Sequence, residues 1–152
     1  MPRSGRDVEG RVLVAGTAAA PALVLQAPLS LWGGLDPRTG RVSDRHHPQL
    51  GATVNGRVLV MPSGRGSSSS SSVLAEAIRL GTAPLAILVE EPDEILVLGA
   101  IVADHLYART CPVLVVAEAT RLIATGDHVR ISRDGTVTII PGRCEPPRRA
   151  RR

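Results

Sequence analysis

The sequence of 152 residues contains no Phe, one Trp and one Tyr. Its core must therefore be built from Val, Leu, Ile and Ala, which suit closely packed layers of strands and helices. The shortage of aromatic rings also argues against a nucleic-acid-binding surface, because such surfaces combine spread basic charge with stacking side chains. All 18 basic residues are Arg, a chain-wide bias that marks no individual site.

Cysteine is nearly absent as well. Cys111 and Cys144 are the only two, and they form no C-x-x-C pair. We therefore expect no metal site, no iron–sulfur site and no disulfide framework built by this chain alone, and we expect Cys111, just before an apolar stretch, to be a core thiol. There is no uncharged apolar run of about 18 residues and no apolar stretch near the N-terminus, so we expect no membrane span, no signal peptide and a cytoplasmic protein.

The positive charge is concentrated at one end. Residues 143–152 carry five Arg and one Glu, which account for the whole net charge of +4, so residues 1–142 are balanced. A neutral body with a basic end favours a single domain over residues 10–142, a frayed N-terminus at 1–9 and a disordered basic tail at 143–152. Nucleic-acid binding through the tail is the alternative that this pattern leaves, and we do not favour it.

The apolar pattern predicts an α/β domain. Strands are predicted at 11–15, 22–26, 57–61, 85–89 and 113–116, an extended segment at 28–32, a long loop at 33–54, helices at 67–80 and 92–106, and a short helix within 117–124. An Asp-Gly turn predicts a hairpin of strands 128–132 and 136–140. Because helical crossovers join the central strands, we expect them to be parallel within a mixed sheet.

The stretch from Met61 to Ser72 (MPSGRGSSSSSS) carries the clearest chemical signal. A strand leads into a turn containing two glycines, and a helix then begins at a serine. A helix N-terminus presents unpaired N–H groups that bind anions and stabilise an alkoxide. The Gly-Lys-Ser/Thr of nucleotide-binding loops is absent. Structural capping, a low-complexity linker and a stand-alone site for small anions remain the alternatives.

A second polar cluster lies within the long loop: Gly33, Gly34, Asp36, Asp44, His46 and His47. The acids and histidines are candidate acid/base groups. The structural alternative is a set of Asx turns and surface histidines. Adjacent histidines on extended chain point in different directions, so a joint metal site is not expected.

Several segments together resemble the small subunits of the aconitase X family: 31–37 (LWGGLDP), 39–41 (TGR), 44–48 (DRHHP), 62–69 (PSGRGSSS) and 83–98. Each segment alone is a weak signal, whereas their combination, in this order across roughly residues 10–140, is specific.

The resemblance implies a swivelling β/β/α domain that acts with a large subunit, which holds an iron–sulfur centre or iron and most catalytic residues. It implies a dehydratase acting on a hydroxy acid, either cis-3-hydroxy-L-proline or, in archaea, mevalonate 5-phosphate. The Lys-free composition is typical of a GC-rich bacterial genome and favours the first substrate.

The resemblance also implies site residues. Aconitases carry a G-x-G-S-S-R loop whose first serine is the base, and alignment of residues 64–68 with it gives this role to Ser67. Ser69 stands where those relatives have Arg, which leaves Arg65 as the cation of the loop. The expected substrate-binding residues are Gly64, Arg65, Gly66, Ser68, Ser69, Gly33, Gly34, Asp36 and His47, with no metal ligand in this chain.

Overall fold

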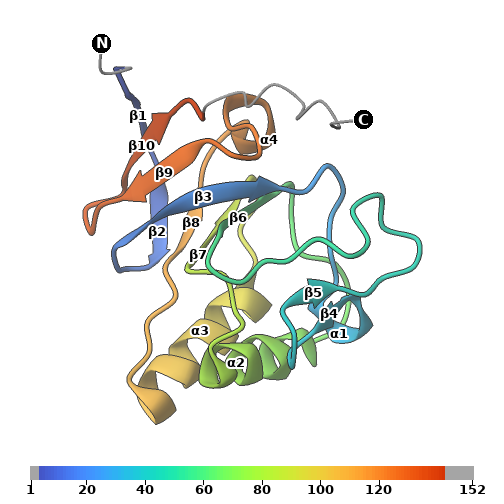
Figure 1. Cartoon of the computed structure of the whole chain (residues 1–152). Coiled ribbons are helices and arrows are strands. Elements are labelled where there is room, and N and C mark those ends of the chain that lie inside the picture. The colour runs from blue at the N-terminus through green and yellow to red at the C-terminus, as the bar shows by residue number, and fades with distance from the viewer. Residues whose placement is uncertain (1–3, 143–152) are drawn as a thin grey trace, which may run out of the picture.

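The computed structural model describes residues 4–142, which form one curved sheet with the two long helices on its outer side (Figure 1). The strands of the main sheet are β1 (Arg6–Glu9), β2 (Arg11–Val14), β3 (Ala18–Val24), β6 (Val58–Met61), β7 (Ala86–Val89), β8 (Val113–Val115), β9 (His128–Ile131) and β10 (Thr136–Ile140). The other elements are α1 (Leu31–Gly34), β4 (Leu35–Asp36), β5 (Arg41–Val42), α2 (Ser70–Leu80), α3 (Glu94–Tyr107) and α4 (Ala119–Leu122).

The sheet has eight strands in the order β1-β10-β9-β3-β6-β7-β8-β2. Strands β3, β6, β7 and β8 are parallel, as predicted, whereas β1, β10, β9 and β2 pair antiparallel with their neighbours. Strands β1 and β2 lie at opposite edges of this order, yet only Gly10 separates them in the chain. The two edges must therefore lie side by side, and the sheet curls into a near-barrel.

Successive side chains along each strand point to opposite faces of the sheet, and this alternation produces two hydrophobic cores. Every strand of the main sheet contributes to the first, which fills the interior of the near-barrel with side chains such as Val60, Leu88 and Val129. The second lies between the outer face of the sheet and helices α2 and α3, and contains Leu59, Ile87 and the helical Leu74. Full burial of one such side chain is worth about 1.5–3 kcal/mol.

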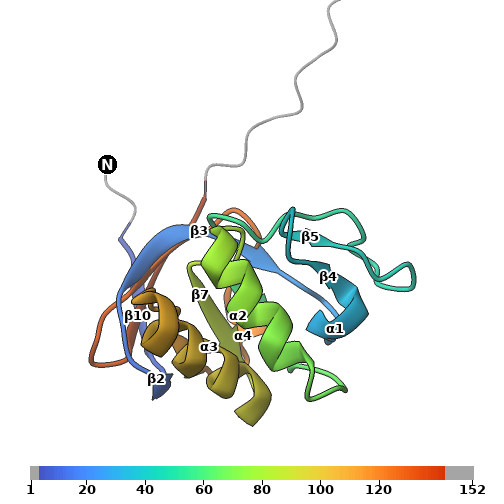
Figure 2. The ribbon, with the colours of Figure 1, turned by 90° about the horizontal axis from the view of Figure 1, so that it is seen from below.

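Helices α2 and α3 run side by side under the parallel strands (Figure 2). The predicted end of α2 is correct, whereas α3 begins at Glu94, two residues later than predicted. Gly81, in the left-handed conformation, ends α2, and the Asp93 side chain accepts hydrogen bonds from two backbone N–H groups at the start of α3. The predicted hairpin is β9 and β10, and the short helix is α4. The expected single α/β domain with a mixed sheet is confirmed.

The prediction of a frayed N-terminus over residues 1–9 is wrong for its later part. Residues 6–9 form β1, which pairs with β10 more than 120 residues later in the chain. The polar sequence of β1 suits an edge strand, whose side chains are mostly exposed, and only Val8 packs into the core. Residues 1–3 of the predicted N-terminus and the expected basic tail (143–152) lie outside the described residues.

The predicted boundaries of three segments before β6 also shift. Strand β3 begins before Pro21, because the residues up to Pro21 pair with β9 while pairing with β6 starts one residue later. The extended segment 28–32 ends in the single turn α1, and the loop 33–54 contains the β4–β5 hairpin. Among the described residues, no helix is both long and apolar enough to cross a membrane.

Candidate functional site

The carboxyl ends of the parallel strands meet at one edge of the sheet, and the predicted serine-rich segment lies there. The loop 62–69 follows β6, and residues 90–93 follow β7 and lead into α3. The segment that follows β3 runs beside the serine loop, because Leu29 and Gly64 form a parallel bridge. In open α/β sheets, ligands bind at the carboxyl ends of the strands.

Ser67 occupies a tight turn just before α2. Its Oγ accepts a hydrogen bond from the backbone N–H of Ser69 (3.2 Å), and its carbonyl accepts one from the N–H of Ser70 (3.0 Å). Helix α2 therefore begins at Ser70, three residues later than predicted, because a serine side chain competes for backbone N–H groups that a helix would use. Ser67 is half-buried, whereas Ser68 and Ser69 are exposed.

Asp93 lies against the serine loop, and sequence analysis did not include it among the site residues. Its Oδ1 accepts hydrogen bonds from the N–H groups of Ile95 (2.9 Å) and Leu96 (3.2 Å), which caps α3. Its Oδ2 lies so close to the Cα of Gly64 that a Cβ there would overlap the carboxylate. This contact results from the strand order. Because β6 and β7 are neighbours in the sheet, the serine loop after β6 lies beside the start of α3, which follows β7.

The other side of the loop is lined by the segment before α1. A Cβ on Gly66 would lie 3.6 Å from the Ser30 hydroxyl, so the side chain of Ser30 lies beside Gly66. Arg65 is exposed, and within residues 4–142 its guanidinium makes neither a hydrogen bond nor an ion pair. The one cation of this loop is thus available to an anionic group brought by a ligand or by another protein chain.

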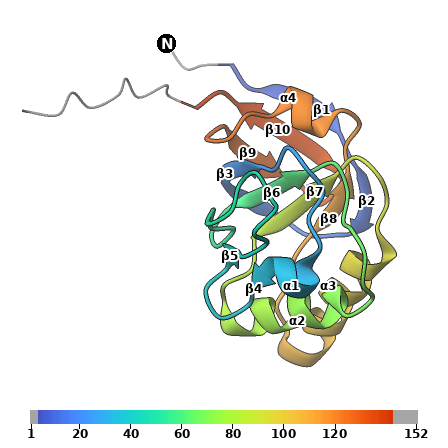
Figure 3. The same cartoon turned by 90° about the vertical axis from the view of Figure 1, so that its right-hand side faces the viewer.

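Ser70 joins the two predicted clusters. Its buried Oγ accepts a hydrogen bond from the backbone N–H of Trp32 (3.0 Å), which holds α1 against the start of α2 (Figure 3). Gly33 and Gly34 follow directly, and their carbonyls accept hydrogen bonds from the hydroxyl and N–H of Ser43. The structure therefore brings Gly33 and Gly34 to the end of α2 at which Ser67 lies.

Replacement of Ser70 by Ala should lower the free energy of unfolding by about 1–3 kcal/mol, because the N–H of Trp32 loses its partner in a partly buried position. Ser72→Ala is the matched control: Ser72 is exposed on the same helix, and we expect a change within about 0.5 kcal/mol. Urea unfolding of both variants measures the difference. Equal stabilities would show that the Ser70 bond contributes nothing to folding.

His47 holds the loop 43–50 in place. The ring is buried; its Nδ1 accepts a hydrogen bond from the N–H of Gln49 (3.0 Å), so Nε2 carries the proton and donates to the carbonyl of Ala27 (3.1 Å). Gln49 in turn accepts from the N–H of Gln26. His47 thus anchors the segment that leads from β3 to α1 and runs beside the serine loop, and both of its ring nitrogens are occupied. The neighbouring His46 is exposed, and its backbone N–H closes an Asx turn with Asp44.

Asp36 lies far from the serine loop. Its carboxylate accepts hydrogen bonds from the backbone and side chain of Arg38, and these bonds lower the pKa of Asp36. The next residue, Pro37, accepts a hydrogen bond from the hydroxyl of Thr82, just beyond the C-terminal end of α2. A helix of 11 residues spans roughly 16 Å. The structure therefore does not bring Asp36 together with Ser67.

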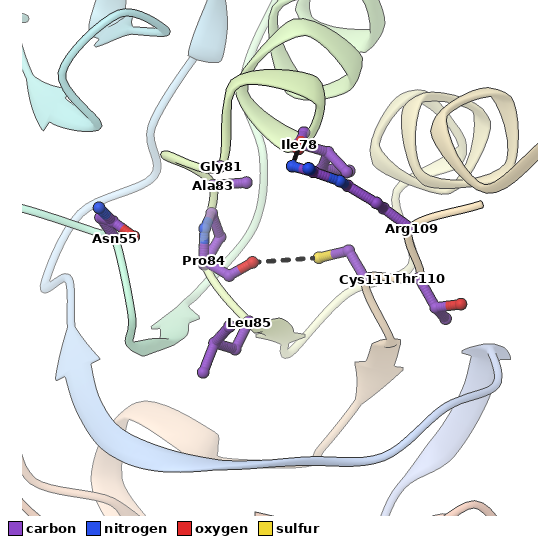
Figure 4. A pocket seen from close by; sticks show the side chains of 9 residues that line it. All are labelled: Asn55, Ile78, Gly81, Ala83, Pro84, Leu85, Arg109, Thr110 and Cys111. Carbon is purple, nitrogen blue, oxygen red and sulfur yellow. Dashed lines mark hydrogen bonds between the residues drawn. The ribbon is translucent and has the colours of Figure 1, made fainter. Parts of the chain in front are cut away.

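A cavity of about 180 Å³ lies at the opposite edge of the sheet, where the parallel strands begin (Figure 4). Two of its polar side chains, Arg109 and Cys111, are already engaged. The Arg109 guanidinium donates to the carbonyls of Ile78 (3.2 Å) and Arg79 (3.1 Å) at the end of α2, and the Cys111 thiol donates to the carbonyl of Pro84. We assign this cavity no chemical role.

Burial raises the pKa of Cys111 to about 12, and this residue is the core thiol that the sequence predicted. In a Cys144→Ser variant, Cys111 should not react with a disulfide reagent at pH 8 until denaturant is added.

The pKa of Cys111 also predicts a pH dependence of stability, because the unfolded thiol titrates near pH 9. Between pH 9 and 12 the folded chain thus binds more protons, and the free energy of unfolding should fall as the pH rises. Cys111→Ala should remove that part of the slope; rapid native labelling would contradict the assignment.

Within residues 4–142, no group of three His, Cys, Asp or Glu side chains lies in an arrangement that could hold a metal ion. The chemistry of the serine loop therefore rests on hydroxyl groups, backbone N–H groups, Arg65 and the Asp93 carboxylate. Such a set can bind an anion and take up or release a proton.

Comparisons with known proteins agree with this geometry. The sequence profile of the aconitase X swivel domain matches residues 7–139. The chain is 48% identical to the cis-3-hydroxy-L-proline dehydratase of Pseudomonas aeruginosa over 129 residues, 85% of this chain but only 22% of that protein. It is 42% identical to the phosphomevalonate dehydratase small subunit of Methanopyrus kandleri over 79% of this chain and 86% of that one.

A solved structure shows the same fold. The crystal structure of Thermococcus kodakaraensis aconitase X in its holo-form contains a chain that superimposes with a TM-score of 0.81 at 35% identity, covering 90% of this chain and 100% of that one. The segments that resembled aconitase X small subunits thus fold as the swivel domain of that family, with the serine loop at the carboxyl edge of its parallel strands. The chain belongs to the aconitase X swivel domain family.

Proposed function

We propose that this protein is the small subunit of a heteromeric dehydratase and that it supplies Ser67 as the base. The observation that carries the proposal is the position of Ser67: it lies in a half-buried turn at the carboxyl edge of the parallel strands, with its Oγ held by a backbone N–H. The names of the relatives, dehydratases and dehydratase small subunits, support the reaction class.

A dehydration at this site requires a base that starts without its proton. The C–H proton of the substrate passes to the Oγ of Ser67, the C–H electron pair becomes the new double bond, and hydroxide leaves the neighbouring carbon. The serine proton and the hydroxide together make water. The N–H of Ser69 stabilises the alkoxide that precedes this step, and Arg65 lies in the same loop to attract an anionic substrate.

The iron–sulfur centre or iron of the family does not fit the described part of this chain. Cys111 is buried with a pKa near 12, and no cluster of ligand side chains lies near the serine loop in residues 4–142. We propose that the large subunit holds this group. The departure of the substrate hydroxyl is therefore assigned to groups outside this chain, and the role of this chain is limited to the proton and to substrate orientation.

We propose cis-3-hydroxy-L-proline as the substrate, because the Pseudomonas aeruginosa relative that carries this name shares 48% of the aligned residues. Mevalonate 5-phosphate is the second candidate. It is favoured by the Methanopyrus kandleri relative, which is itself a separate small subunit and matches over 86% of its length. The exposed Arg65 and the N–H groups of the loop can donate hydrogen bonds to either a carboxylate or a phosphate.

The test is co-expression of this chain with the aconitase X large subunit of the same organism, followed by anaerobic assays of both compounds. Turnover of cis-3-hydroxy-L-proline supports the proposal in full, and turnover of mevalonate 5-phosphate alone overturns only the substrate. If the two chains do not associate, or if the isolated small chain binds an anion tightly without a partner, the protein is a stand-alone binding module and the proposal fails.

A further inference from the structure

Helix α3 is apolar on both of its sides. Its inner side is buried against α2 and the sheet through Leu96, Gly99, Ala100 and Ala103. Its outer side carries five large apolar side chains between 36% and 61% exposed, which we call the outer α3 face: Leu98, Ile101, Val102, Leu106 and Tyr107. A helix that is apolar all round is normally buried on all sides.

The neighbouring helix shows what a solvent-facing surface of this protein looks like. On the exposed side of α2, Glu76 and Arg79 form an ion pair (2.6 Å). On α3 the exposed acidic and histidine residues are Glu94 at the start and Asp104 and His105 near the end, which leaves the stretch from Leu98 to Val102 uncharged. Figure 2 shows α3 facing the viewer with no other described element over it.

Two hollows flank Leu98, which lines both. One, of about 430 Å³, lies between α3 and β2 and is lined by Leu13 and Ile101, with Arg11, Asp93 and Glu94 also in its wall. The other, of about 260 Å³, lies between α3 and α2 and is lined by Ser71 and Tyr107, with Glu76 also in its wall. An exposed apolar side chain between two hollows can be enclosed by side chains of a partner, the arrangement found at the energetic centre of protein interfaces.

We propose that the outer α3 face is the surface that docks the large subunit, an inference that rests on the proposed function. The face is continuous with the serine loop: Asp93, which contacts Gly64, begins α3, and Ser71, which follows the loop, lines one of the hollows. A partner chain that completes the site around Ser67 must approach this edge of the sheet. An apolar seat beside that edge fixes its position relative to the serine.

The relatives indicate what kind of partner this surface would bind. The matched region is 22% of the Pseudomonas aeruginosa dehydratase, so most of that protein lies outside the swivel domain, and the Methanopyrus kandleri relative is named a small subunit. Domains of this family thus accompany a much larger protein body, as part of one chain or as a separate subunit. The complementary surface is expected to be apolar as well, since the centre of the outer α3 face offers no charge to pair.

The test is Leu98→Asp in the co-expressed complex. A charge at the centre of an apolar interface should weaken binding of the large subunit at least tenfold, measured as the dissociation constant by interferometry. The matched control is Leu85→Asp: Leu85 is 46% exposed, against 54% for Leu98, and lies where β7 begins, at the edge opposite the serine loop. It should bind as the unchanged chain does. Both variants should keep the circular dichroism spectrum and melting temperature of the unchanged chain.

Salt separates this proposal from a charge-driven contact. Raising NaCl from about 0.1 M to 1 M shortens the Debye length from about 10 Å to 3 Å and should leave the association intact. If the unchanged chains form an active complex and Leu98→Asp binds as tightly as Leu85→Asp, the docking surface is elsewhere while the proposed function stands. If Leu98→Asp instead disrupts only a homodimer of this chain, the occupant is a second copy and the proposal is overturned.

Discussion

Replacing Ser67 by Ala should lower the turnover number of the reconstituted enzyme roughly 10²- to 10⁴-fold, the usual contribution of a positioned base. The Michaelis constant should change little, because the removed oxygen acts on the proton and the binding groups of the loop remain. The fold should remain too. Ser67 is only half-buried, and its Oγ holds a single N–H, that of Ser69, which solvent can satisfy instead.

The controls separate chemistry from assembly. Ser72→Ala makes the same chemical change on an exposed position of α2 and should leave turnover as it is. Ser67→Ala should still bind the large subunit with unchanged affinity. Normal turnover by Ser67→Ala would remove this serine from the mechanism, and loss of association would assign it to the subunit interface.

Replacing Gly64 by Ala should disturb the site almost as much, for a steric reason. The new Cβ overlaps Oδ2 of Asp93, so either the loop or the helix cap must move. Overpacking of this kind costs about 1–3 kcal/mol of folding free energy. A displacement of about 1 Å at a catalytic group lowers rates about 10²-fold, and we expect that loss in the turnover number.

A second substitution shows whether the overlap is the cause. Asp93→Ser keeps a hydroxyl oxygen to cap α3 and removes the second carboxylate oxygen, so alone it should change stability by only a few tenths of a kcal/mol. Combined with Gly64→Ala, it should restore most of the lost stability and turnover, a positive coupling in a double-mutant cycle. Strict additivity would exclude the steric account. A large loss of turnover in Asp93→Ser alone would instead place the carboxylate itself in the chemistry.

The contact between Gly64 and Asp93 also explains what the swivel domain contributes as a scaffold. The loop after β6 and the cap of α3 follow neighbouring parallel strands, and each restrains the other. A third segment, beside Ser30, closes the other side of the loop and is anchored through His47. The serine loop is therefore held between two segments that are distant in the sequence, which supplies the rigidity that the proposed base requires.

The sequence predicted what local chemistry controls. Helix α2 ends at Gly81 and α3 begins after Asp93 because a left-handed glycine and an aspartate cap are local signals. The hairpin of β9 and β10 follows from its Asp-Gly turn in the same way. The central strands could be predicted as parallel because helices lie between them in the sequence. Parallel strands need such a crossover connection, whereas a tight turn joins antiparallel strands. Ser67 was selected as a candidate because its loop resembles the glycine- and serine-containing loop of aconitases.

Only the tertiary structure decided which segments become neighbours. Residues 6–9 looked frayed, because a short polar strand shows no pattern until β10 is available to pair with it. Asp36 shared a motif with Gly33 and Gly34, yet the β4–β5 hairpin carries it along α2 to the far end. In the sequence Asp93 marked only the start of a helix, and its contact with Gly64 follows from the order of the strands. The periodicity of apolar residues indicates which side chains are buried. Which residues they pack against depends on the tertiary fold of the whole chain.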